Sequence, residues 1–302
     1  MRTTSGHFIF KGEFAVELKK HQPSMSLDGQ IANLRELGLI IDDEKSAVHF
    51  LNDVSYYRFI KAYSLGLKPK NGVYSDGVTF ELLKDLYIFN CNFRQLIFPL
   101  IERIEVNLRC RVSNYFCEKY GVLGYLNYDN FSIKEYHDEF LCDADAELYR
   151  NAKAPFVKNF SQNYEGGKLP FYALVELLSF GTLSKFYKNM KNEDKKAVAK
   201  TYGVGYTYFE SWIESCAFVR NVCAHYGRLY NVNLAKPPMM YKQYEGIDNF
   251  KIFALLLCFK YLVPDDLHWA QFVETLELLI ERYSDVKINL MGFPENWVEM
   301  LK

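Results

Sequence analysis

The segment RNVCAHYGRLYN, residues 220–231, places an arginine, an asparagine and a histidine within six positions. In a helix, Asn221 and His225 lie four residues apart on one face, about 6 Å from each other, and the long side chain of Arg220 can swing toward the same place. An imidazole can take a proton from a ribose 2′-hydroxyl or give one to a 5′-oxygen leaving group, while a guanidinium stabilises charge on the phosphate. The segment could therefore cleave RNA without a metal ion.

The same spacing has a simpler interpretation. An arginine and a histidine in this arrangement occur by chance in many helices, mostly as surface or core-edge residues. One helix also supplies only one histidine, whereas acid–base cleavage of RNA is best served by two. A two-fold homodimer would supply the second, because an isologous interface sets each helix against its symmetry mate. The residue chemistry alone leaves both interpretations open.

Two carboxylates could assist this segment. Glu102 and Glu105 lie in one predicted helix. A buried carboxylate there could orient His225 or pair with Arg220. The alternative is a structural ion pair with an arginine of the same helix, and the sequence does not decide between the two.

Several cations could hold an RNA backbone. Arg228 is the best placed of them, because it lies three residues after His225. In the SYYR segment, Tyr56 and Tyr57 are expected mainly to pack, with stacking on RNA bases as the lesser alternative. A lysine-rich segment offers a third set, although such a segment is more often a solvated helix face. Its candidate RNA contacts are Lys185, Lys188, Lys191, Lys195 and Lys196.

The composition is that of a globular protein with a large core. Hydrophobic residues make up 49% of the 302 residues and charged residues 24%, which argues against wholesale disorder. The formal net charge of −1 gives no overall attraction to nucleic acid or membrane. Any binding of a polyanion must therefore come from a local patch.

The seven cysteines form no CxxC pair, and no Cys/His cluster has the spacing of a zinc site. The N-terminus lacks the continuous apolar core of a signal peptide, and the apolar stretch at 252–259 is too short to cross a bilayer. We therefore expect a soluble cytoplasmic protein with reduced thiols, with no metal, no cofactor and no contact with a membrane.

Helical periodicity dominates the chain. Residues 30–67 predict two helices, the first ending near Gly38 and the second capped by Asp42 or Asp43. Residues 68–80 predict a turn-rich connector or a small hairpin. The long stretch 80–120 has apolar residues at every third or fourth position, and Pro99 is expected to kink or divide it.

The rest of the chain continues the helical pattern. A middle helix is expected near 133–150, and another at 171–190 that Gly181 could break. Further helices are expected from the segments that begin near residues 192, 206, 249 and 265, the fourth of them following Pro264. No segment shows the alternation typical of strands, so the sequence predicts an all-α protein.

The segment RNVCAHYGRLYN resembles the R-N-x-x-A-H-x-x-R-L-[WY]-N signature of the Abi-D/F-like abortive-infection proteins, a branch of the HEPN superfamily. Three further blocks are similar to this family in the same order. They are QIANLRELGLIIDDEKSAVHFLNDVSYYRFIKAY, LIFPLIERIEVNLRCRVSNYF and LPFYALVELLSFGTLSKFYKNM. The four blocks together span roughly residues 30 to 260, with no departure at the motif positions.

This resemblance implies an all-helical HEPN-type bundle with an N-terminal helical extension. We accordingly expect a tail at 1–24, the helical extension at 25–70, the HEPN-like domain at 78–285 and a C-terminal tail at 286–302. The family's R-x4-6-H motif implies that Arg220 and His225 are a catalytic pair, with Asn221 as the polar residue that follows the arginine.

The resemblance also implies an activity and partners. Members of this kind are metal-independent endoribonucleases whose site is usually composite across a homodimer, and they leave cyclic-phosphate or 3′-phosphate and 5′-hydroxyl ends. They act as toxins that arrest phage-infected bacteria, and related ones are held in check by a small non-coding RNA. RNA is thus the expected substrate and an antitoxin RNA a further partner, with no role for DNA.

Two other functions compete with this one. A non-catalytic RNA-binding or interaction module could keep the same fold, although it would have no need to retain Arg220, Asn221 and His225 together. A metal-dependent phosphodiesterase is disfavoured because the sequence lacks clustered histidines and aspartates.

Overall fold

The computed structural model describes residues 23–68 and 72–302, and the regular structure within them is helical. The predicted all-α helical bundle is confirmed. Two isolated β-bridges, Ile40–Thr79 and Phe131–Met190, are the β pairing found in these ranges. The described part of segment 68–80 therefore forms a turn-rich connector and not a hairpin. Residues 1–22 of the predicted N-terminal tail lie outside the described ranges.

Three helices form the N-terminal segment, where the sequence predicted two. They are α1 (Leu27–Glu36), α2 (Glu44–Asp53) and α3 (Tyr56–Tyr63). Of the two predicted caps, Asp42 and Asp43, the structure has Asp43, whose carboxylate accepts from the backbone N–H of Ser46. The expectation of one continuous second helix is wrong because Val54 is extended and the Ser55 hydroxyl accepts from the N–H of Arg58, which starts a new helix.

The helix α4 (Phe80–Tyr120) is 41 residues long and contains Pro99. At 1.5 Å per residue it is about 60 Å long. Of the two outcomes expected at Pro99, a kink or a division, the division is wrong, because one helix continues through the proline. Pro99 and Gln95, whose carbonyl loses its usual donor, are both exposed, while Ile97 and Leu100 are buried beside them. Water can therefore satisfy the free carbonyl, and packing holds the helix together on both sides of the proline.

The middle of the chain folds against one end of α4. The predicted middle helix is confirmed as α5 (Lys134–Arg150), and α6 (Pro155–Asn163) follows it. The helix expected at 171–190 is two, α7 (Phe171–Leu174) and α8 (Phe180–Asn189). The break lies before Gly181, because the Ser179 hydroxyl caps α8 by accepting from the N–H of Thr182.

The remaining helices build the other half of the core. They are α9 (Asn192–Lys200), α10 (Tyr206–Ala224), α11 (Ile252–Leu262), α12 (Asp266–Arg282) and α13 (Trp297–Leu301). One face of α10 is apolar and buried, and it consists of Phe209, Ile213, Cys216, Val219 and Cys223. Short 3-10 helices lie at Gly124–Leu126, Tyr128–Asn130, Glu165–Gly167, Lys242–Tyr244 and Ile288–Met291.

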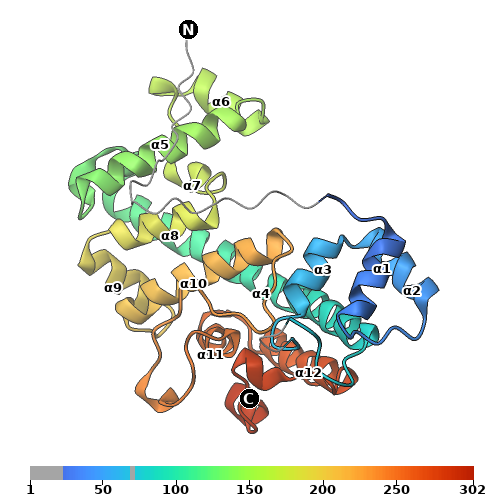
Figure 1. Cartoon of the computed structure of the whole chain (residues 1–302). Coiled ribbons are helices and arrows are strands. Elements are labelled where there is room, and N and C mark those ends of the chain that lie inside the picture. The colour runs from blue at the N-terminus through green and yellow to red at the C-terminus, as the bar shows by residue number, and fades with distance from the viewer. Residues whose placement is uncertain (1–22, 69–71) are drawn as a thin grey trace, which may run out of the picture.

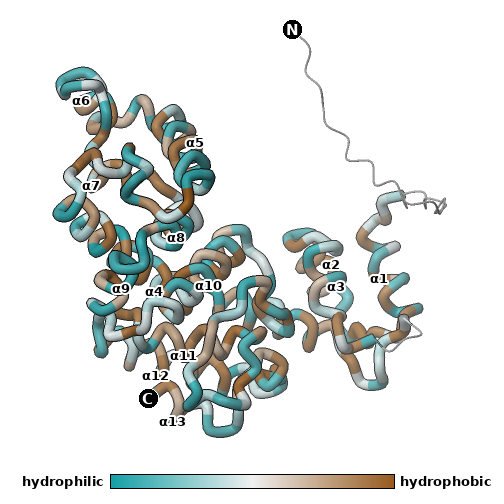
Figure 2. The backbone as a smooth tube through the Cα atoms, turned by 90° about the vertical axis from the view of Figure 1, so that its left-hand side faces the viewer, coloured by the Kyte–Doolittle hydropathy of each residue, from teal (hydrophilic) through white to brown (hydrophobic). Residues whose placement is uncertain are grey.

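Residues 286–302, expected above to be a tail, pack into this core. Met291, Phe293, Trp297 and Leu301 are buried, and the indole of Trp269 donates to the carbonyl of Leu301 at 2.8 Å. In Figure 2, α11 is brown along most of its length, which agrees with its nearly complete burial.

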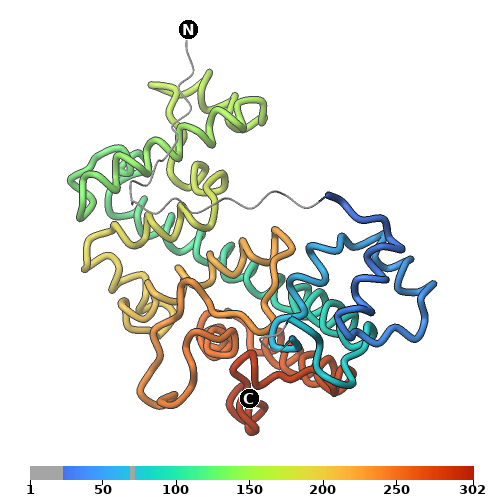
Figure 3. Tube along the Cα trace, in the orientation of Figure 1, coloured from blue at the N-terminus to red at the C-terminus, as the bar shows by residue number. Residues whose placement is uncertain are grey.

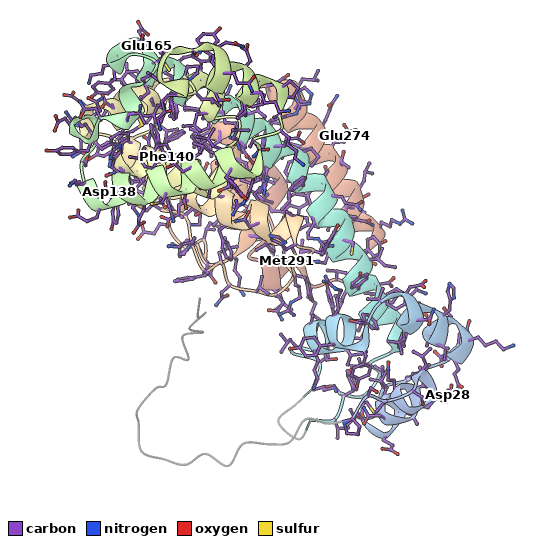
Figure 4. All side chains as sticks on the ribbon, turned by 90° about the horizontal axis from the view of Figure 1, so that it is seen from above. Asp28, Asp138, Phe140, Glu165, Glu274 and Met291 are labelled. Atoms are coloured by element: carbon purple, nitrogen blue, oxygen red, sulfur yellow. The ribbon has the colours of Figure 1, made fainter. Side chains whose placement is uncertain are left out.

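Figure 1 shows α1–α3 on one side of the molecule and α5–α7 at the other end of α4, with α10 crossing the middle. Seen from above in Figure 4, Asp28 of α1 and Glu165 lie toward opposite ends of the molecule, and α4 runs between these two groups of helices. No helix in the described ranges has both the length and the apolar character needed to span a bilayer.

An aromatic cluster stabilises the end formed by α5–α8. The Phe186 ring is buried and lies 4.5–5.2 Å from the ring centroids of four other phenylalanines. Those rings belong to Phe116, Phe131, Phe140 and Phe171. We expect Phe186→Ala to lower the free energy of unfolding by about 3–5 kcal/mol, because it removes the ring and leaves a cavity.

Urea unfolding followed by circular dichroism measures this change. Phe156→Ala is the matched control, since Phe156 is exposed on the nearby α6. The control should change stability by less than about 0.5 kcal/mol. Equal losses in the two variants would contradict the assigned core.

Candidate active site at the end of α10

The polar residues of the segment 220–231 lie at the C-terminal end of α10. Asn221 and His225 are exposed, and His225 is the C-cap residue of the helix. The Arg220 side chain is 35% exposed. Neither Asn221 nor His225 makes a side-chain hydrogen bond or ion pair with any other described residue, so both side chains are available to a ligand.

A tight turn ends the helix directly after His225. The N–H of Gly227 donates to the carbonyl of Val222 at 2.7 Å, and the N–H of Tyr226 donates to that of Cys223 at 3.1 Å. This is the Schellman pattern, in which the residue after the cap takes a left-handed conformation. Here that residue is Tyr226, with φ of 57°. A Cβ on Gly227 would lie 2.7 Å from the Val222 side chain, so the turn needs glycine there.

Two other helices hold this turn in place. The buried side-chain oxygen of Asn90, in α4, accepts from the N–H groups of Leu229 and Tyr230 at 2.8 and 3.0 Å. Arg94 of α4 donates to the carbonyl of Gly227 at 2.9 Å, and Arg58 of α3 donates to that of Tyr226 at 2.9 Å. Figure 3 shows the orange chain after α10 passing beside blue α3 and the start of α4. The position of His225 is therefore fixed by long-range contacts.

Arg228 belongs to the same framework. Its guanidinium donates to the carbonyl of Ala62 in α3, and the side chain is partly buried. The sequence predicts Arg228 as a phosphate contact, but its main partner is backbone of the N-terminal segment. The second half of the motif therefore serves chiefly to build the turn.

Arg220 is held by one of the two predicted carboxylates. Its Nε lies 3.4 Å from a carboxylate oxygen of buried Glu105, which also pairs with Arg109. Arg109 donates in addition to the carbonyl of Leu178 at 2.7 Å. Glu105 therefore makes both of the proposed ion pairs, one with Arg220 and one with Arg109 of its own helix. Glu102 is exposed and makes no ion pair within the described ranges, and neither carboxylate orients His225.

Arg220 and His225 open onto different hollows of the surface. Arg220 lines one of about 320 Å³ with Glu102, Glu105 and Val106. His225 lines another of about 550 Å³ with residues of α3. Five residues of helix correspond to a rotation of about 140°, which separates the two side chains around α10. The expectation that Arg220 reaches the same pocket as His225 is not met within one chain.

The lysine-rich segment lies elsewhere. Lys195 is buried and pairs at 2.9 Å with Glu210, in the first part of α10. His225 is 15 residues further along, about 22 Å along the helix axis. Buried Lys195 is therefore excluded as a direct RNA contact. The other four candidate lysines are accessible. Three of them are exposed, Lys185, Lys188 and Lys196, and Lys191 is partly exposed.

The charge around these lysines is mixed. Lys188 lies 3.6 Å from Glu214, and a cavity beside Lys185 is also lined by Glu139 and Asp143. The surface around these lysines is therefore of mixed charge and not a purely basic patch.

Cationic and aromatic residues line the same hollow as His225, and of these the sequence had indicated only Tyr57 and Arg228 as possible RNA contacts. Arg58 and Lys61 of α3, together with Tyr57 and Tyr226, line the same hollow. The SYYR segment contains Tyr57 and Arg58, but it is far from His225 along the chain. The sequence therefore did not show that these residues line the same hollow. No group of three or more potential metal ligands occurs in residues 23–68 and 72–302.

Comparison with known protein families gives a match over more than half of the chain. The model of the family described as Abi-like protein matches residues 49–231, from within α2 to the end of the turn after α10. The chain belongs to the Abi-like protein family. The same comparison with curated proteins and with solved structures gives no match.

The side chain of Asn90 should be essential for the turn. We expect Asn90→Ala to lower the free energy of unfolding by about 1–3 kcal/mol, because it leaves two backbone N–H groups without an acceptor. Chemical denaturation measures the change, and Asn114→Ala, at an exposed position of the same helix, is the control. A loss of stability no greater than in the control would show that water replaces the Asn90 oxygen.

Proposed function

We propose that this Abi-like protein is a metal-independent endoribonuclease toxin of an abortive-infection system, with a HEPN-type fold and a composite R-x4-H site. The observation that carries the proposal is the contrast within its motif. Asn221 and His225 are exposed and unpartnered at the end of α10, whereas Leu229 and Tyr230, later in the motif, are buried and bound by Asn90. A purely structural helix end gives no reason to hold two unpartnered polar side chains in a fixed, exposed position.

The proposed chemistry is transesterification of RNA. His225 takes the proton of a ribose 2′-hydroxyl, the 2′-oxygen forms a bond to phosphorus, and the bond from phosphorus to the 5′-oxygen breaks. The departing 5′-oxygen takes a proton from solvent, which leaves a cyclic phosphate and a 5′-hydroxyl. Arg220 stabilises the negative charge that grows on the phosphate oxygens. Its link to Glu105 and Arg109 holds the guanidinium in one place before substrate binds.

A homodimer would complete the site. Within one chain Arg220 and His225 line different hollows on α10, so we propose that Arg220 of one copy acts with His225 of the other. Val106, next to Arg220, is 60% exposed and offers apolar surface for such a contact. A small antitoxin RNA that covers the same hollows would keep the toxin inactive.

Loss of His225 tests the catalytic role directly. Purified His225→Ala should cleave RNA on the order of 10²- to 10⁴-fold more slowly than wild type in excess EDTA, because it lacks the proton acceptor. His49→Ala, an exposed histidine of α2, is the control and should cleave like wild type. Product ends are identified by their resistance to phosphatase before and after opening of the cyclic phosphate. Dependence on magnesium, or full activity of His225→Ala, would refute this mechanism.

Mixing two inactive variants tests the dimeric site. A heterodimer of Arg220→Ala and His225→Ala retains one site in which both residues are intact, if the pair is formed between copies. With equal mixing, half of the dimers are heterodimers with one of two sites intact, so we expect about a quarter of wild-type activity. Activity that stays at the level of the separate variants would place the pair within one chain. A silent RNA-binding module would show binding without cleavage in every sample.

A further inference from the structure

Tyr226 occupies a position that disfavours a side chain. Its φ of 57° lies in the left-handed region, at the place in a Schellman turn where glycine is usual. A bulky residue there is an outlier that the rest of the structure must stabilise. Burial of the ring does not compensate, because Tyr226 is 68% exposed. A strained and exposed tyrosine directly after His225 indicates a role in binding.

The hollow beside Tyr226 has the chemistry of a nucleotide site. Tyr57, which is 78% exposed, offers a second aromatic ring, and the Arg58 guanidinium lies 6.0 Å from the centroid of the Tyr226 ring. Arg58, Lys61 and Arg228 supply positive charge, and no aspartate or glutamate lines the hollow among the described residues. Its volume of about 550 Å³ is sufficient for a nucleotide.

Arg58, Lys61 and Arg228, which line the hollow, form no ion pair with a carboxylate among the described residues. Burial lowers the pKa of Lys68, and the positive charge of Lys61 lowers it further. Exposed Lys61 has no ion pair among the described residues. An uncompensated cation beside exposed aromatic rings attracts a phosphate and also offers surface on which a base can stack.

We propose that Tyr226 and Tyr57, with Arg58 and Lys61, bind an unpaired nucleotide of single-stranded RNA next to the phosphate on which His225 acts. This inference rests on the proposed function, because it names the substrate class of the same site. The base stacks on an aromatic ring and the adjoining phosphates contact Arg58 and Lys61. Bases of a duplex are already stacked on one another, so the hollow selects single strands, loops or ends.

The inference also gives the N-terminal helices a role. Tyr57, Arg58 and Lys61 all belong to α3, whereas His225 and Tyr226 belong to α10 and its turn. The bond from Arg58 to the carbonyl of Tyr226 fixes the two halves of the hollow relative to each other. The substrate site is thus shared between the extension and the main bundle.

A non-cleavable RNA separates binding from catalysis. We would use a single-stranded oligonucleotide with 2′-O-methyl groups throughout and one 2-aminopurine, whose fluorescence is quenched when it stacks. Wild type should bind it and quench one probe position. Tyr226→Gly should bind on the order of 10-fold more weakly and lose that quenching, because the ring is gone. It should also melt roughly 2 °C higher, because glycine suits the left-handed turn.

Three further variants complete the experiment. Tyr226→Phe keeps the ring and should restore the quenching, whereas Tyr149→Ala removes an exposed tyrosine of α5 and should leave binding unchanged. Lys61→Ala should weaken binding and reduce its dependence on salt, since one phosphate contact is lost.

The outcomes distinguish this inference from the proposed function. Cleavage by wild type with an unchanged KM in Tyr226→Gly would overturn the nucleotide site and leave the nuclease intact. Quenching that depends on Tyr226 in a protein that cleaves no RNA would support the site and refute the nuclease. Wild type that binds no single-stranded RNA, or quenches no probe position, would overturn the inference.

Discussion

One buried amide oxygen holds the candidate site together. The side chain of Asn90, which is fully buried, accepts from two successive backbone N–H groups of the turn after α10. Buried N–H groups must find an acceptor, so this interaction decides where the turn can lie. Arg94 and Arg58 then bind the carbonyls on the preceding residues of the same turn. His225 owes its fixed and exposed position to this set of contacts.

The sequence predicted the helices well where a local pattern determines them. Apolar periodicity identified α4 and α10, and the Asp43 cap was found from its residue type. The errors came where long-range packing decides. Burial of Ile97 and Leu100 keeps α4 continuous past Pro99, and no local pattern reports that burial. The packing of residues 286–302 was likewise hidden, because their apolar residues have no clear helical period.

The motif identified the candidate residues but not their separate functions. Arg228, at a motif position, builds the turn through Ala62, whereas Tyr226, at a variable position of the signature, faces the hollow. The strain at Tyr226 arises only when Gly227 closes the helix, so the residue type alone could not reveal it. The contact between α3 and the turn after α10 joins residues far apart in the sequence, since Arg58 and Tyr226 are separated by 168 positions. Such a pairing lies beyond any local sequence pattern.

Because α4 is long, a substitution in it can affect the positions of both Arg220 and His225. Asn90 and Glu105 are 15 residues apart on this one helix, which places them on nearly the same side and about 22 Å apart. One secures the turn beside His225, and the other secures Arg220. The single helix α4 thus sets the positions of Arg220 and His225 relative to each other. A substitution that bends or rotates α4, even at a distant position, would displace Arg220 and His225 together. Both functional groups of the motif would then be lost at once.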